Sequence, residues 1–173
     1  MARRTDTDAH ADMSVAVGGV VFKMHSCVMR VGCDYFRGLL ENARLDNGRF
    51  VFVLRKCDQN PVGPQAFRAA LDYIYTDKPT MHVPDLVALG QYRDDIYVWR
   101  PYAVVVDVLK TADFLLIEPM VNAYTQLLQQ ILTPETVVDT LELLEDIPGL
   151  RKAREVATEY FVKNAGAVQV REL

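Results

Sequence analysis

Short runs of β-prone residues open the chain and are separated by turn sequences. Residues 14–17 and 20–24 are two such runs, and Gly18-Gly19 joins them. A glycine pair at this place favours a tight hairpin, because both central residues of a primed turn adopt positive φ. A third run covers residues 49–54, after the turn sequence Asp46-Asn47-Gly48. Its β-branched and aromatic residues favour a strand, so the three runs predict a small sheet.

Amphipathic helical stripes alternate with these runs. Ser26 is expected to cap a short helix that Gly32 ends, and Asp34 is expected to accept from the free amides of the next helix. That next helix has apolar residues every three or four positions: Tyr35, Phe36, Leu39 and Leu40. A helix after Pro64 has the same kind of stripe: Phe67, Leu71, Ile74 and Tyr75.

The second half of the chain is predicted to be helical after a long connection over residues 77–95. Residues 96–99 are expected to form a last strand ended by Pro101, and helices follow from Tyr102. The first helical stripe is Val105, Val108, Leu109, Ala112 and Leu116; the second is Val121, Tyr124, Leu128 and Ile131; the third is Val138, Leu141 and Leu144.

Prolines mark where these later helices begin and end. Pro119 suits the first turn of the second helix. Thr133 and Pro134 predict a cap and a first position for the third, and Pro148-Gly149 separates it from a last helix over residues 150–163. The fold class predicted is α+β, with strands and helices mixed in the first hundred residues and antiparallel helical hairpins afterwards.

Composition and charge exclude several classes of function. The net charge of −4 and a pI near 5.4 do not suit a nucleic-acid surface, which needs clustered cations. The first dozen residues contain no apolar run, and no stretch is long enough to span a bilayer. Three cysteines without a C-x-x-C pair fit a reducing compartment, so a cytoplasmic protein is expected.

Candidate chemical sites are sparse. His25, Cys27 and Cys33 lie close in sequence, but the two regularly spaced halves of a zinc site are absent. Gly18-Gly19 lacks a phosphate-binding pattern, and neither serine of the chain stands in a nucleophile elbow. We therefore expect no metal, no cofactor and no enzymatic activity.

The ordered set of motifs resembles a BTB/POZ domain. Residues 12–19, 22–25 and 34–37 resemble its opening, and residues 67–76 and 108–115 resemble its later helices. Residues 131–162 are similar to the helices that join BTB to BACK in adaptors of cullin-3 ubiquitin ligases. The resemblance implies a BTB/POZ domain over residues 12–132, a small sheet flanked by helices. It also implies a 3-box or partial BACK segment over residues 133–173.

The resemblance further implies where partners bind. The N-terminal region of cullin-3 would contact a face formed by Asp34, Arg44, Leu45, Asp46, Phe114 and Leu115. A homodimer would form through Val28, Val31, Tyr35 and Leu39. A later domain, often a kelch propeller, would hold the substrate protein.

The chain departs from the family pattern in four places. Only eleven mostly polar residues precede Asp12, where adaptors usually have an apolar leading helix and strand, so a weaker dimer is expected. Arg44 stands where the cullin contact normally has a hydrophobic residue, and Ser26 stands where many relatives have a basic one. Residues 81–95 resemble an insertion. Compact, divergent chains of this kind resemble those of large DNA viruses, such as poxviruses.

Three functions remain open. The first is a cullin-3 adaptor, and the second is a decoy that occupies the cullin without a substrate. The third is the self-associating module of a transcriptional regulator that recruits corepressors. The predicted helices after Thr133 favour the adaptor, because regulators of that type generally end near residue 132.

Overall fold

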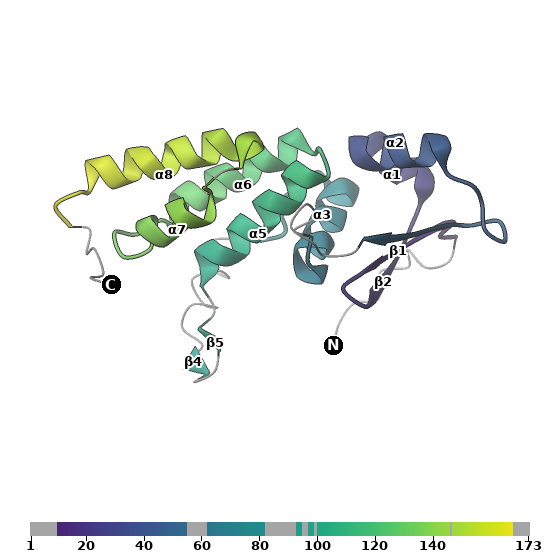
Figure 1. The fold of residues 1–173 in the computed structure, drawn as a ribbon, viewed down its shortest axis with the longest axis horizontal. Coiled ribbons are helices and arrows are strands. Elements are labelled where there is room, and N and C mark those ends of the chain that lie inside the picture. Colours follow the sequence, from purple (N-terminus) through teal and green to yellow (C-terminus); the bar gives the residue numbers. More distant parts are fainter. Residues whose placement is uncertain are drawn as a thin grey trace.

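The computed structural model describes residues 10–54, 62–81, 93–94, 97–98, 100–145 and 147–167. Strands and helices share the first part of the chain, and helices alone make up the rest, so the α+β class is confirmed (Figure 1). The elements are β1 (Met13–Val17), β2 (Val20–Met24), α1 (Ser26–Gly32), α2 (Asp34–Asn42), β3 (Phe50–Leu54), α3 (Pro64–Thr76), β4 (Arg93–Asp94), β5 (Tyr97–Val98), α5 (Pro101–Phe114), α6 (Glu118–Ile131), α7 (Val137–Leu143), the 3-10 turn η2 (Pro148–Leu150) and α8 (Arg151–Lys163).

The main sheet has three strands in the order β2-β1-β3. β1 pairs antiparallel with β2 and parallel with β3. Gly18 and Gly19 have φ of 53° and 82°, which confirms the predicted primed hairpin. The turn before β3 is confirmed as well: Asn47 and Gly48 have positive φ, and Asp46 and Arg49 exchange backbone hydrogen bonds of 2.8 and 2.9 Å.

The predicted caps of α1 and α2 are wrong. His25 is the N-cap of α1, and Ser26 instead donates its N–H and its hydroxyl to the Asp12 carboxylate at 2.7 and 2.6 Å. Asp34 is the first residue of α2 and pairs with Arg37 at 2.8 Å. The reason is tertiary, because the strand β1 brings Asp12 to the start of α1, where it supplies the acceptor.

Aromatic rings join the sheet to the helices α2 and α3. Phe67 of α3 meets Phe22 of β2 edge to face at 4.9 Å and also faces Phe36 of α2. Phe36 in turn lies 6.2 Å from Phe52 of β3. Figure 1 shows α3 between the sheet and the later helices, so these rings form the middle of one continuous core.

Proline positions begin several helices as predicted, with one correction. Pro64 and Pro119 stand in the first turns of α3 and α6. Pro101 begins α5 rather than ending a strand. The expected last strand exists over Tyr97–Val98, but it pairs with β4 in a separate two-stranded sheet. Residues 82–92, 95–96 and 99, including most of the expected insertion, lie outside the described residues.

The helices after α6 pack on the earlier ones, and α7 buries a different set of residues from the predicted stripe. Thr136, not Thr133, is the N-cap of α7, because residues 134–136 form a turn. The buried face is therefore Val137, Thr140 and Leu144, while Val138 and Leu141 of the predicted stripe are half-buried. Tyr102 of α5 donates to Asp139 of α7 at 2.6 Å, and Arg100 also donates to Asp139 at 2.9 Å.

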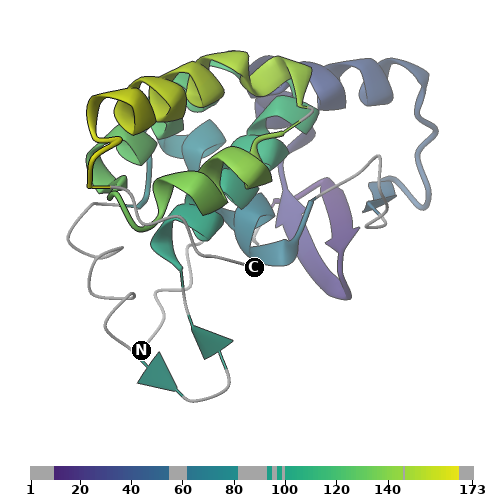
Figure 2. The ribbon, with the colours of Figure 1, turned by 60° about the vertical axis from the view of Figure 1, so that its left-hand side comes forward.

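The last helix closes the core. Leu150 of η2 and Ala153 and Ala157 of α8 are fully buried in the same apolar cluster that begins in the sheet. Figure 2 shows α7 and α8 lying over α5 and α6. None of the helices in the described part of the chain is both long and apolar enough to cross a bilayer.

Candidate functional site

The junction between α5 and α6 holds the most unusual backbone in the described part of the chain. Leu116 adopts φ of 57°. Its N–H donates to the carbonyl of Asp113 at 3.0 Å, and the N–H of Ile117 donates to the carbonyl of Ala112 at 2.9 Å. These two bonds form a Schellman motif, in which the left-handed position is usually glycine. A leucine at this position carries strain of about 1 kcal/mol.

This geometry turns Leu116 outward. Its side chain is 61% exposed, although the sequence pattern predicts it on the buried stripe of α5. That prediction is wrong because α5 ends at Phe114 and the left-handed residue changes the direction of the chain. Leu115 takes the buried place instead, with no exposed side-chain area.

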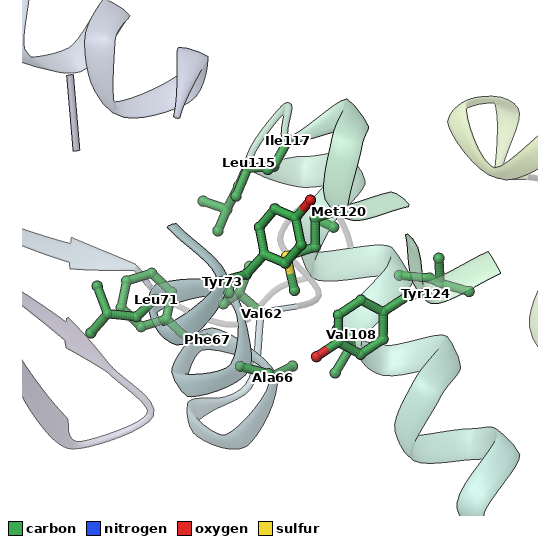
Figure 3. Packing of buried hydrophobic residues seen from close by; sticks show 14 of the residues in the cluster. Val62, Ala66, Phe67, Leu71, Tyr73, Val108, Leu115, Ile117, Met120 and Tyr124 are labelled. Carbon is green, nitrogen blue, oxygen red and sulfur yellow. The ribbon is translucent and has the colours of Figure 1, made fainter. Parts of the chain in front are cut away.

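Leu115 holds the neighbouring helices through its backbone. Its carbonyl accepts from the Cys33 thiol at 3.1 Å and from the Tyr35 N–H at 3.4 Å. Figure 3 shows the side chains of Leu115 and Ile117 in the core close to Tyr73 of α3. Among the expected cullin contacts, Leu115 is thus the residue whose side chain a partner cannot reach in this structure.

Two hollows flank Leu116, and acidic side chains line both. One has a volume of about 320 Å³ and includes Asp34, Asp113 and Glu118. The other has a volume of about 350 Å³ and includes Val31 of α1. Asp34, Leu116 and Glu118 line both hollows. We call Leu116 together with Asp34, Asp113 and Glu118 the Leu116 surface.

The first hollow joins α5 to the C-terminal helices. Gly149 of η2 lines it together with Asp113. A Cβ on Gly149 would overlap the Asp113 carboxylate, so any larger residue here requires that side chain to turn away. Burial raises the pKa of the Asp113 carboxyl above its ordinary value, because a partly buried carboxylate loses hydration.

The other expected cullin contacts are divided between two places. Asp34 lies at the Leu116 surface, at the start of α2. Arg44, Leu45 and Asp46 follow the far end of this nine-residue helix, about 14 Å along its axis. All three are exposed, and Asp46 accepts from the side chain of Asn47 at 3.1 Å.

Phe114 and two of the expected dimer residues, Val31 and Tyr35, lie next to the same surface. Phe114 is half-buried, and its ring lies 4.9 Å from the ring of Tyr35. Burial raises the pKa of Tyr35. Val31 is 85% exposed, whereas Val28 and Leu39 are half-buried.

Two residues of the candidate metal site, His25 and Cys33, have other partners. The N–H of His25 donates to the Tyr75 hydroxyl at 3.0 Å, and the Nδ1 of His25 lies 2.9 Å from the same oxygen. Cys33 is buried, which raises the pKa of its thiol to about 11, and Cys27 is exposed. Among the residues described, no three His, Cys, Asp or Glu side chains gather in a way that suits a metal ion.

Comparison with known proteins gives a family match and a structural likeness. A model of the BTB/POZ domain matches residues 3–132, which is most of the chain. A solved structure, the BTB domain of zebrafish PATZ1, is 18% identical over 69% of this chain and 76% of that one, with a TM-score of 0.46.

Proposed function

This chain belongs to the BTB/POZ domain family, whose members are generally non-enzymatic interaction modules, and we propose that it is an adaptor for cullin-3. In this proposal the chain binds the N-terminal region of the cullin and links it to a substrate protein for ubiquitination. The observation that carries the proposal is the Leu116 surface, where an outward leucine lies between acidic hollows.

The Leu116 surface has the features of a binding hot spot. The Schellman motif fixes the backbone of its apolar residue, so little backbone entropy is lost when a partner covers it. Covering a leucine of this exposure contributes about 1–2 kcal/mol. The carboxylates of Asp34 and Glu118 lie on its border, and they favour a partner with basic residues around an apolar pocket.

The C-terminal helices take part in the proposed contact. Gly149 lines one hollow with Asp113 and Leu116, so a partner in that hollow touches both the expected BTB segment (12–132) and the expected 3-box segment (133–173). A self-associating regulator module has no need for such a shared surface. This is the reason for preferring the adaptor over the regulator.

The segment Arg44, Leu45 and Asp46 forms the second part of the proposed contact. It is exposed and follows the C-terminal end of α2, whereas the Leu116 surface lies at the N-terminal end of that helix. Asp46→Arg should weaken cullin binding, because it reverses a charge that a basic partner meets. Arg44→Met should strengthen binding, since it restores an apolar side chain at the position where the family has one.

The proposed homodimer uses Val28, Val31, Tyr35 and Leu39, with Val31 as its most exposed member. Light scattering across a concentration series tests it, and Val31→Asp should shift any dimer to the 19.6 kDa monomer. Because Val31 also lines a hollow beside Leu116, the same variant reports whether dimerisation and cullin binding depend on each other.

A calorimetric titration with the purified N-terminal region of cullin-3 tests the function itself. Leu116→Asp should weaken binding by about tenfold or more, since it removes the apolar anchor and adds a fourth acid. Val162→Asp on α8 is the matched control, because Val162 is 67% exposed and lies outside the proposed contact. Absence of wild-type binding, or equal loss in both variants, would contradict the proposal. Binding without transfer of ubiquitin to any substrate would favour the decoy.

A further inference from the structure

The larger of the two hollows beside Leu116 is framed by three helix ends. Asp77 is the C-cap of α3, Val31 lies in the last turn of α1, and Glu118 begins α6. The volume of about 350 Å³ is at the small end of the range of about 300–1,000 Å³ for ligand pockets. We call this space the Tyr73 hollow, after the core residue that also lines it.

The hydroxyl of Tyr73 has no partner in the described part of the chain. The side chain is only 7% exposed and lines the hollow. In Figure 3 its oxygen points toward Ile117, which lines the same hollow. None of the described residues forms a hydrogen bond with this hydroxyl, although the Tyr73 carbonyl accepts from the Asp77 N–H at 2.7 Å. A buried polar group of this kind needs a partner from outside the chain, and the hollow is the side from which it can come.

Negative charge surrounds this hydroxyl. Asp77 and Glu118 form no ion pair within the residues that the structure describes, whereas Asp34 is paired with Arg37 at 2.8 Å. Burial raises the pKa of Tyr73, and the negative charge of Asp77 raises it further, so this carboxylate lies near the hydroxyl. Helix α3 has no basic residue in its last turn, so the negative end of its dipole lacks a cation too. The hollow therefore favours a cationic ligand.

The arrangement suits an arginine side chain better than other cations. Among the residues described, no three acidic, histidine or cysteine side chains gather in a way that suits a metal ion. The ammonium of lysine is a compact, strongly hydrated charge, whereas the planar guanidinium has five N–H donors that reach acceptors on different sides. The stem of an arginine packs on apolar surface, and Val31, Ile74 and Leu116 supply that surface around the hollow.

We propose that the Tyr73 hollow takes an arginine side chain from the protein that covers Leu116. The guanidinium donates to the carboxylates of Asp77 and Glu118 and to the hydroxyl oxygen of Tyr73, while the stem packs beside Val31. The inference rests on the adaptor function, in which that protein is the N-terminal region of cullin-3. It adds a charged contact of defined chemistry to the apolar contact at Leu116.

A small arginine probe tests the hollow without the cullin. Nα-acetyl-arginine N-methylamide is titrated into the ¹⁵N-labelled full chain while amide chemical shifts are recorded. Saturable shifts are expected at Ile74, Asp77 and Ile117, with a dissociation constant in the millimolar range. The citrulline analogue has nearly the same shape without the charge and should bind about tenfold more weakly or worse. The lysine analogue should bind about threefold more weakly.

Two variants each remove a single group of the hollow. Asp77→Asn removes the charge and keeps the left-handed backbone with φ of 55°, which asparagine also adopts. It should lower the affinity for both the probe and cullin-3 by about fivefold or more. Tyr73→Phe removes only the hydroxyl and should lower both affinities by about twofold to fivefold. Thermal melts should show no loss of stability in either variant, because neither removed group has a partner among the described residues.

Glu142→Gln on α7 is the matched control for charge. Glu142 is exposed and lies outside the hollow, so this variant should change neither affinity.

The outcomes separate the hollow from the adaptor function. Equal binding of the arginine and citrulline probes, or unchanged probe affinity in Asp77→Asn and Tyr73→Phe, would overturn the proposal. Unchanged cullin affinity in both variants would overturn it as well, while the adaptor function would stand. Saturable arginine binding without any cullin binding would contradict the adaptor function alone and would support the hollow as an arginine site.

Discussion

The Leu116 surface and the outer face of β3, with Val51 and Val53, both expose apolar side chains, but they differ in the charges nearby and in the backbone that presents them. Leu116 lies among Asp34, Asp113 and Glu118, whereas β3 stands between arginines in the sequence. Leu116 is held outward by a strained turn, whereas Val51 and Val53 are exposed by ordinary strand geometry. Exposed apolar area alone does not identify a contact surface; the strained turn and the acidic border at Leu116 are what support the proposed one.

The largest effect is expected where the Leu116 surface depends on the C-terminal helices. Gly149→Ala places a methyl group against the Asp113 carboxylate, so the Asp113 side chain must change its rotamer or η2 must shift. We expect a loss of about 1–2 kcal/mol in the free energy of unfolding, measured by chemical denaturation, together with weaker cullin binding.

Gly38→Ala is the matched control for that change. Gly38 lies on an exposed face of α2, and a Cβ there meets nothing within 4 Å. Alanine in a helix should stabilise the protein by about 0.5–1 kcal/mol. Equal stability of the two variants would show that the contact between Gly149 and Asp113 does not join the helices.

Leu116→Gly should separate stability from binding. Glycine adopts positive φ without strain, so the free energy of unfolding should rise by up to about 1 kcal/mol. The same change removes the exposed side chain, so cullin affinity should fall by about tenfold. Calorimetry should show the lower cullin affinity, and chemical denaturation should show the higher free energy of unfolding. A fall in stability would contradict the strain at this turn.

The acidic surroundings of Leu116 predict a pH dependence of stability. Burial raises the pKa of Asp113 in the folded protein, so the folded state favours the protonated carboxyl. Its contribution to stability is full below the ordinary pKa of 3.8 and is lost as the pH rises through the folded value. Asp113→Asn should therefore raise the melting temperature at pH 7 relative to the wild type, and the difference should vanish near pH 3.

The smallest effect is expected from a single charge beside β3. Arg49→Glu reverses an exposed charge at the start of β3, where surface substitutions change the free energy of unfolding by no more than about 0.5 kcal/mol. The melting temperature and cullin binding should not change. A loss of cullin binding in this variant would mean that the two surfaces are not separate.

Local chemistry determined most of the architecture. Gly18 and Gly19 dictate the hairpin because few other residues accept their φ values. The buried positions Phe67, Tyr124 and Leu128 follow the helical period of the sequence. Pro64 and Pro119 mark helix starts because proline lacks the amide that the first turn leaves unpaired anyway. These signals act within a few residues, so the sequence alone carries them.

Only the tertiary structure decided the caps and the outward leucine. Ser26 does not cap the helix as predicted but binds the Asp12 carboxylate, which lies just before β1. Leu115 and Leu116 are neighbours of the same type, and nothing local in the sequence tells which one is buried. The packing of Leu115 against the first helices and the Schellman bonds at the end of α5 fix the answer. Such choices depend on residues distant in sequence, because a buried side chain and a paired backbone group need partners that only the folded chain brings near.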